Sequence, residues 1–121
     1  MSTIKADTLS NLAGTQSVPV ATVAQGSAKA WVNFNGTGTV AIRASFNVSS
    51  ITDAGNGQYY VNFTTAMPDA NYATNLSGYR AVSWANGGLN VGLFTTTSVY
   101  VQNVENNTST DTSIMCVSIF R

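Results

Sequence analysis

Carboxylates are the first side chains to consider for catalysis, because the chain contains no histidine and so lacks the commonest general base. The acidic residues are Asp7, Asp53, Asp69, Glu105 and Asp111. A glycosidase needs two carboxyl groups that face each other across a substrate. Asp53 and Asp69 lie in separate predicted turns, where an aspartate more often accepts a hydrogen bond from its own backbone. The sequence therefore predicts that the chain is not an enzyme, with a small glycan-active enzyme as the disfavoured alternative.

Three further patterns bear on metals and cofactors. Residues 53–57 (DAGNG) lack the spaced acidic ligands and the final glutamate of an EF-hand loop. Residues 35–38 (NGTG) lack the Gly-Lys-Ser/Thr that completes a phosphate-binding loop. Cys116 is the only cysteine, which excludes an internal disulfide and a cysteine-built zinc site. The sequence predicts no metal site and no cofactor.

One loop has the composition of a binding surface. Tyr79, Arg80 and Trp84 precede Asn86 and Gly87 in a segment with strong turn signals. Aromatic and amide groups suit sugar rings or a protein partner, and loops on a rigid scaffold often carry function. We therefore treat these five residues as a candidate partner-binding loop, with burial of Trp84 in the core as the alternative.

Composition limits the remaining classes of protein. The chain has 121 residues and a mass of 12.7 kDa, which fits one domain. Only 8 % of the residues are charged, five basic and five acidic, so no basic stripe for nucleic acid is available. No run approaches the roughly 20 apolar residues of a membrane-spanning helix. The first residues also lack the apolar region of a secretory signal. We expect neither nucleic-acid binding nor membrane insertion.

Periodicity predicts strands from residue 28 onward. In 58–65 the apolar Tyr59, Val61 and Phe63 alternate with more polar residues, which is typical of a half-buried strand. The predicted strands are 28–34, 39–44, 46–51, 58–65, 71–81, 89–96, 98–104 and 112–120. Gly- and Asn-rich turns separate them, and such turns tolerate positive φ. Short strands at this spacing predict an all-β protein, an antiparallel β-sandwich that is jelly-roll-like.

The last predicted strand is apolar on both faces. Its candidate interface residues are Ile114, Met115, Val117, Ile119 and Phe120. A strand of this kind is buried on both sides. In a small antiparallel domain it is either a central strand under a cover or a strand at a subunit interface. The low charge of the chain favours the interface, and with it a homotrimer.

Residues 1–27 differ from the rest of the chain. They contain no aromatic residue, and their apolar residues follow no sustained helical period. We interpret them as an extended N-terminal docking arm that packs on another surface, with residues 28–121 as the β-sandwich domain. The alternative is a disordered tail, since termini are often disordered unless they are tied down.

More than half of the chain resembles a module of virion structural proteins from tailed bacteriophages, especially marine and cyanobacterial ones. The matching segments are residues 2–8 (STIKADT), 28–31 (AKAW), 36–38 (GTG), 46–50 (FNVSS), 53–59 (DAGNGQY) and 67–72 (MPDANY). Together they span residues 1–72. They are turn and packing signatures rather than catalytic ones, so they identify a module and not an activity.

The resemblance implies a non-enzymatic virion component, assembled in the host cytoplasm and usually homotrimeric. The first expectation is a tail-fibre or appendage protein whose arm binds other virion proteins or sister subunits. A host-surface glycan or protein is then a candidate partner. The alternative is a capsid decoration (cement) protein that stabilises the head shell. The two differ in what the arm binds.

Overall fold

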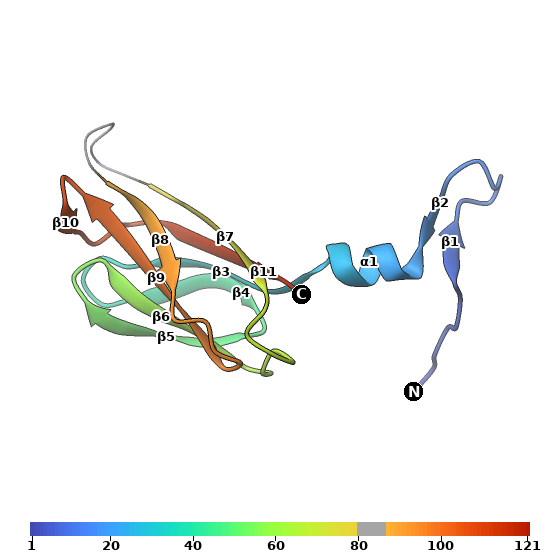
Figure 1. Ribbon diagram of the computed structural model, residues 1–121, viewed down its shortest axis with the longest axis horizontal. Coiled ribbons are helices and arrows are strands. Elements are labelled where there is room, and N and C mark those ends of the chain that lie inside the picture. The colour runs from blue at the N-terminus through green and yellow to red at the C-terminus, as the bar shows by residue number, and fades with distance from the viewer. Residues whose placement is uncertain (80–86) are drawn as a thin grey trace.

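The computed structural model describes residues 1–79 and 87–121 and is an antiparallel β-sandwich with an N-terminal extension (Figure 1). The elements are β1 (Thr8–Ser10), β2 (Ser17–Pro19), α1 (Val20–Gly26), β3 (Ala28–Asn35), β4 (Ala41–Phe46), β5 (Val48–Gly55), β6 (Gln58–Phe63), β7 (Ala73–Gly78), β8 (Gly88–Gly92), β9 (Ser98–Glu105), β10 (Thr108–Ser109) and β11 (Met115–Phe120). The all-β sandwich that the sequence predicts is confirmed. Every predicted strand overlaps an observed one, and β1, β2, α1 and β10 are additional.

Two sheets form the sandwich. The four-stranded sheet has the order β4-β3-β11-β7, and the five-stranded sheet has the order β10-β9-β6-β5 with β8 also paired to β9. Hairpins β3–β4, β5–β6 and β8–β9 each stay within one sheet. The pairs β3–β11 and β6–β9 instead join segments that are distant in the chain. The sheets therefore depend on long-range pairing.

The core lies between the two sheets and follows the alternation of each strand. In β6 the buried positions are Tyr59, Val61 and Phe63, as the sequence pattern predicts. Phe34 of β3 crosses from the opposite sheet and contacts the Tyr59 ring edge-on, with ring centroids 5.1 Å apart. A second aromatic pair, Phe63 and Tyr72, has centroids 5.8 Å apart. Edge-to-face pairs of this kind add to the stabilisation that burial itself provides.

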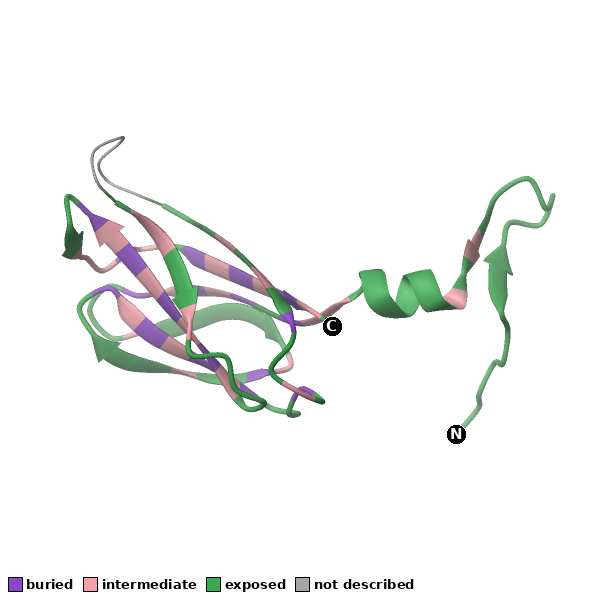
Figure 2. Ribbon diagram, in the orientation of Figure 1, coloured by how far each residue is buried: buried purple, intermediate pink, exposed green. Residues whose placement is uncertain are grey.

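The N-terminal arm stands away from the sandwich (Figure 1). Strands β1 and β2 form a small antiparallel hairpin, and α1 connects it to β3. No residue of 1–27 is buried, and almost the whole arm is coloured as exposed in Figure 2. The sequence predicts an arm that is extended throughout. The structure instead folds part of the arm into a hairpin and the helix α1. Hydrogen bonds within the arm, such as Val20 N to Asp7 O at 2.9 Å, form this local structure.

Candidate functional site

The outer surface of the four-stranded sheet presents an aromatic pair beside polar side chains. We call this surface the Trp31 face, and its residues are Trp31, Asn33, Phe46, Asn75, Ser77, Cys116 and Ser118. They point outward because their neighbours in each strand, such as Val32 and Val117, point into the core. Trp31 shares the outward side of β3 with Lys29, Asn33 and Asn35, which are all polar. This alternation is the sequence signal that marks Trp31 as an outward residue.

Strand register places these side chains in rows across the sheet. Trp31 is the partner of Phe46 on one side and of Ser118 on the other, and Ser118 is the partner of Asn75. Opposed side chains in neighbouring strands lie close enough to contact. Trp31 is 41 % exposed and Phe46 is 56 % exposed. Two large aromatic side chains thus form an exposed apolar pair at the β3–β4 edge of the face.

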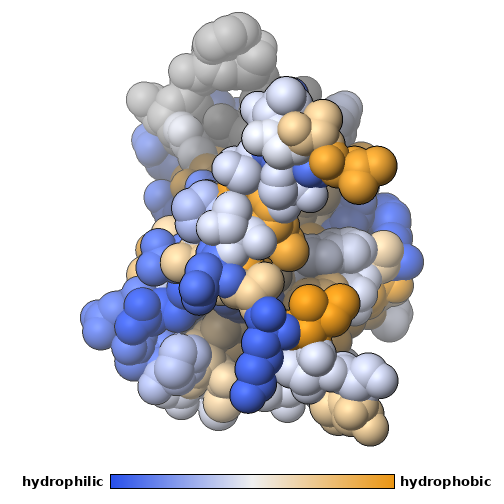
Figure 3. Space-filling model, turned by 90° about the vertical axis from the view of Figure 1, so that its right-hand side faces the viewer, coloured by the Kyte–Doolittle hydropathy of each residue, from blue (hydrophilic) through white to orange (hydrophobic). Residues whose placement is uncertain are grey.

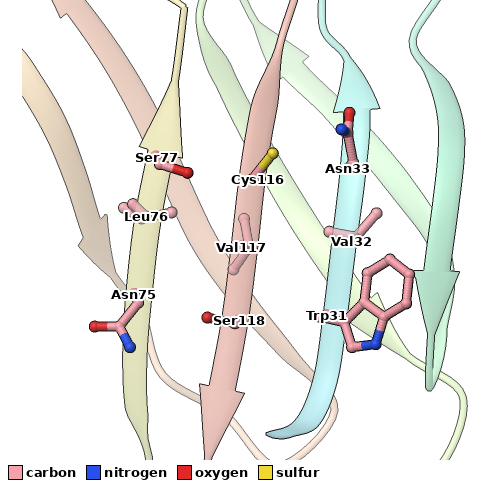
Figure 4. A pocket seen from close by; sticks show the side chains of 9 residues that line it. All are labelled: Trp31, Val32, Asn33, Asn75, Leu76, Ser77, Cys116, Val117 and Ser118. Atoms are coloured by element: carbon pink, nitrogen blue, oxygen red, sulfur yellow. The ribbon is translucent and has the colours of Figure 1, made fainter.

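A shallow groove runs along β11 between β3 and β7 (Figure 4). Its volume is about 380 Å³, and it is lined by Trp31, Val32, Asn33, Asn75, Leu76, Ser77, Cys116, Val117 and Ser118. None of these described lining residues is charged. Beside one end of the groove, the Arg43 guanidinium donates to Asn33 Oδ1 at 3.3 Å and to the Ser113 carbonyl at 2.7 Å. These two acceptors hold the guanidinium in place. The groove offers apolar surface, hydroxyls and amides, but no formal charge.

The predicted interface residues divide into two groups. Met115, Val117 and Ile119 are buried between the sheets of their own chain, because β11 is a central strand covered by the five-stranded sheet. This corrects the interface prediction for these three residues, which belong to the core and are not available at the surface. Ile114 is 40 % exposed and Phe120 is half-buried. Contact of these two with another subunit stays a prediction.

The predicted partner-binding loop is only partly described. Arg80, Trp84 and Asn86 lie outside the described residues. Tyr79 is exposed, its backbone N–H donates to the Ile114 carbonyl at 2.9 Å, and Gly87 is also exposed. The binding role of this loop therefore stays a prediction.

The carboxylates singled out for catalysis bond to nearby backbone. Asp53 Oδ1 accepts from the Gly55 N–H at 3.0 Å, and Asp69 Oδ1 accepts from the Asn71 N–H at 2.8 Å. Asp69 also forms an ion pair with Arg121 at 2.6 Å. Hydrogen bonds from Arg121 and Asn71 lower the pKa of the Asp69 carboxyl. The turn-capping interpretation of both aspartates is confirmed.

The buried Tyr59, together with Asp111, ties the loops around Gly36, Gly57 and Asp111 together at one end of the sandwich. The Tyr59 hydroxyl lies 3.1 Å from the Gly36 carbonyl and 3.0 Å from Asp111 Oδ1, which also accepts from the Gly57 N–H at 2.7 Å. Burial, together with the Asp111 carboxylate, raises the pKa of Tyr59 far above its usual value. The hydroxyl therefore stays protonated and acts as a structural donor.

In 1–79 and 87–121, no group of three or more His, Cys, Asp or Glu side chains is placed to hold a metal ion. Within the same ranges, no helix has the length and apolar character that crossing a membrane requires. Compared with known proteins, the chain matches no family model, no curated protein and no solved structure. Its function must therefore be inferred from the chain itself.

Figure 3 looks onto the end of the molecule that carries the arm. Apolar side chains there form several separate patches among polar ones. Among the large apolar residues that the structure describes, the most exposed are Met1, Ile4 and Leu12 of the arm, and Leu9 is nearly half exposed. Apolar side chains held away from any core are typical of a segment that binds a partner.

Proposed function

We propose that the chain is a non-enzymatic structural component of a bacteriophage virion, in which the arm attaches the sandwich to the assembly. The observation that carries this proposal is the arm itself. It holds Ile4, Leu9 and Leu12 in solvent, and none of its residues belongs to the hydrophobic core that the described residues form. Exposed apolar groups of this kind are stabilised when a partner removes them from water.

The sandwich has the properties of a displayed module. Its core forms without the arm, since every buried apolar residue among those described lies at or after Ala30. Its turns are closed by internal hydrogen bonds, such as those of Tyr59. A stable domain with its own core on a separate docking segment suits a repeated part of a particle. Within that class we propose a trimeric tail-fibre or appendage component.

The test is the location of the chain in particles. Virions of the phage that carries the chain are labelled with antibody and gold and imaged by electron microscopy. We expect the label on the tail or its appendages. A label spread evenly over the head would replace the appendage role by capsid decoration, and particles without label would overturn the virion proposal.

The arm requires a separate measurement. Full-length protein with Leu9→Thr and Leu12→Thr is expected to fold but to be lost from particles, because these side chains are exposed in the isolated chain. A matched control is Leu93→Asn, which removes an exposed leucine from the sandwich at a residue whose φ is 47°. Asparagine tolerates that backbone conformation. Equal incorporation of both variants would contradict a docking role for the arm.

A further inference from the structure

We propose that the arm of one copy docks on the Trp31 face of a second copy, with Leu9 and Leu12 against Trp31 and Phe46. This inference rests on the proposed assembly role and deepens it by naming the partner surface. Two features of the chain that lack a partner, the arm and the aromatic pair, would then cover each other. Three features support this contact: the junction at Ser27, the exposed surface area of the chain, and the absence of charged side chains from residues 8–28 and from the described lining of the groove.

The junction directs the arm away from its own domain. Helix α1 ends at Gly26 and β3 begins at Ala28, so a single residue, Ser27, connects them. Its N–H and its hydroxyl both donate to the Val23 carbonyl, at 3.1 and 2.6 Å. The Lys29 ammonium donates to the Ala24 carbonyl. These contacts fix the direction in which α1 leaves the sandwich (Figure 1). The arm therefore reaches a face of another copy more readily than its own.

The surface area indicates how much the arm leaves uncovered. The chain exposes 7336 Å², whereas a folded monomer of this mass exposes about 6,200 Å². The excess of about 1,100 Å² exceeds the roughly 800 Å² that one partner contributes to a standard stable interface. An arm that buried most of this excess against a partner would reach the area of a standard interface.

The two surfaces also match in charge. Residues 8–28 contain no charged side chain, and none of the described residues that line the groove on the Trp31 face is charged. Burying an unpaired charge is costly, whereas burying hydroxyls and amides requires only hydrogen bonds. The arm supplies Ser, Thr, Asn and Gln beside its leucines, and the face supplies Asn33, Asn75 and Ser118. The proposed contact thus joins uncharged side chains, and the two charges beside it, Lys29 and Arg43, already donate to the Ala24 and Ser113 carbonyls.

The geometry of the contact has a consequence for symmetry. An arm that binds a different surface of its neighbour makes a head-to-tail contact, and such contacts form closed rings when the rotation permits. Three copies in a ring would satisfy every arm and every face. The trimer would then be held by arms and faces, whereas the apolar pattern of residues 112–120 predicts a subunit contact through β11.

The experiment uses purified full-length chains in sedimentation velocity. We compare the unchanged protein, an arm variant (Leu9→Thr with Leu12→Thr), a face variant (Trp31→Thr with Phe46→Thr) and the control Leu93→Asn. Threonine preserves strand propensity at Leu9, Trp31 and Phe46, which lie in strands. Both the arm and the face variants are expected to weaken self-association by more than about tenfold, as loss of central apolar contacts usually does. The control is expected to associate normally.

Mixing the two variants gives the decisive result. The face variant keeps an intact arm and the arm variant keeps an intact face, so the mixture regains one productive contact. We expect a heterodimer in the mixture where each variant alone is monomeric. A mixture that stays monomeric, a face variant that associates normally, or an unchanged protein that is monomeric would overturn the proposal. So would loss of association on Ile114→Thr alone, which would place the contact at the other end of the sandwich.

Fluorescence tests the face even if the face variant folds poorly. The chain has two tryptophans, so Trp84→Phe leaves Trp31 as the only one. Its emission is expected to move to shorter wavelength as protein concentration rises. In a chain that carries Trp84→Phe together with Leu9→Thr and Leu12→Thr, the emission is expected not to move. An emission that is independent of concentration would contradict burial of Trp31. These measurements use no virions, so their failure leaves the virion proposal to its own test.

Discussion

The sandwich and the arm contain similar apolar side chains, but the sandwich buries many of its own whereas the arm leaves its own exposed. In the sandwich, residues such as Phe34, Val61 and Ile119 are removed from water by strands that are distant in the chain. In the arm, Ile4 and Leu12 stay in water because a hairpin of two three-residue strands and a seven-residue helix have no second layer to cover them. Secondary structure is therefore not enough for burial, and an uncovered segment needs a partner.

The two regions also differ in how their turns are held. In the sandwich, the Tyr59 hydroxyl and the Asp111 carboxylate join three loops around Gly36 and Gly57. In the arm, the turn of the hairpin is closed by local bonds, such as Gly14 N to Asn11 O at 3.0 Å. Changes in the sandwich should thus affect global unfolding, whereas the same changes in the arm should not. Four pairs of substitutions test this difference.

The largest expected effect is in the core. Phe34→Ala removes a fully buried ring that packs on Tyr59, and its cavity should lower the free energy of unfolding by about 3–5 kcal/mol. Phe46→Ala is the matched control on the exposed surface of the same sheet, and should cost about 1 kcal/mol or less. Urea denaturation followed by circular dichroism measures both. Equal losses would mean that Phe34 is not a core residue.

Two glycines with positive φ sharpen the comparison. At Gly57 (φ 66°) an added Cβ would lie 2.4 Å from Thr110 N and 2.7 Å from the Asn103 carbonyl oxygen, whereas at Gly14 (φ 69°) nothing lies within 4 Å. Gly57→Ala should therefore cost about 2–4 kcal/mol from backbone strain and overpacking together. Gly14→Ala carries the strain alone and should leave unfolding of the sandwich unchanged. Loss of stability in Gly14→Ala would show that arm and sandwich unfold together.

The tyrosine anchor should have an intermediate effect. Tyr59→Phe removes the donor to the Gly36 carbonyl and to Asp111, which should cost about 1–3 kcal/mol at pH 7. Tyr60→Phe on the outer surface of the same strand is the control. Because the pKa of Tyr59 is raised in the folded protein, its contribution is complete below about pH 10 and falls as pH rises above that value. The difference between Tyr59→Phe and the unchanged protein should therefore shrink in alkali.

The smallest effect concerns the ion pair of Asp69 and Arg121. Both side chains are well exposed, so Arg121→Gln should lower the melting temperature only slightly at pH 7. The pKa of Asp69 is lowered in the folded protein, so this contribution is present above about pH 4 and is lost as pH falls through the folded value. The control Lys5→Gln removes an equal charge from the arm. A difference that persists at pH 2 would contradict the ion pair as its cause.

The sequence alone determined the strands and most of their faces. The alternation in β6 correctly predicts that Tyr59, Val61 and Phe63 face the core. The predicted turn-capping role of Asp53 and Asp69 is also confirmed. These features follow from local physics: a period of two along a strand, and side chains that bond to backbone two residues away.

Only the tertiary structure decided which strands are neighbours and which surface each covers. β11 is apolar on both faces, so its sequence does not distinguish a subunit interface from a central strand, and pairing with β3 and β7 places Met115, Val117 and Ile119 inside. The Trp31 face likewise exists because β3 lies between β4 and β11, which brings Phe46 and Ser118 to either side of Trp31. A local pattern fixes the direction of a side chain relative to its own strand. What lies across from it depends on contacts between segments far apart in the chain, which no local pattern encodes.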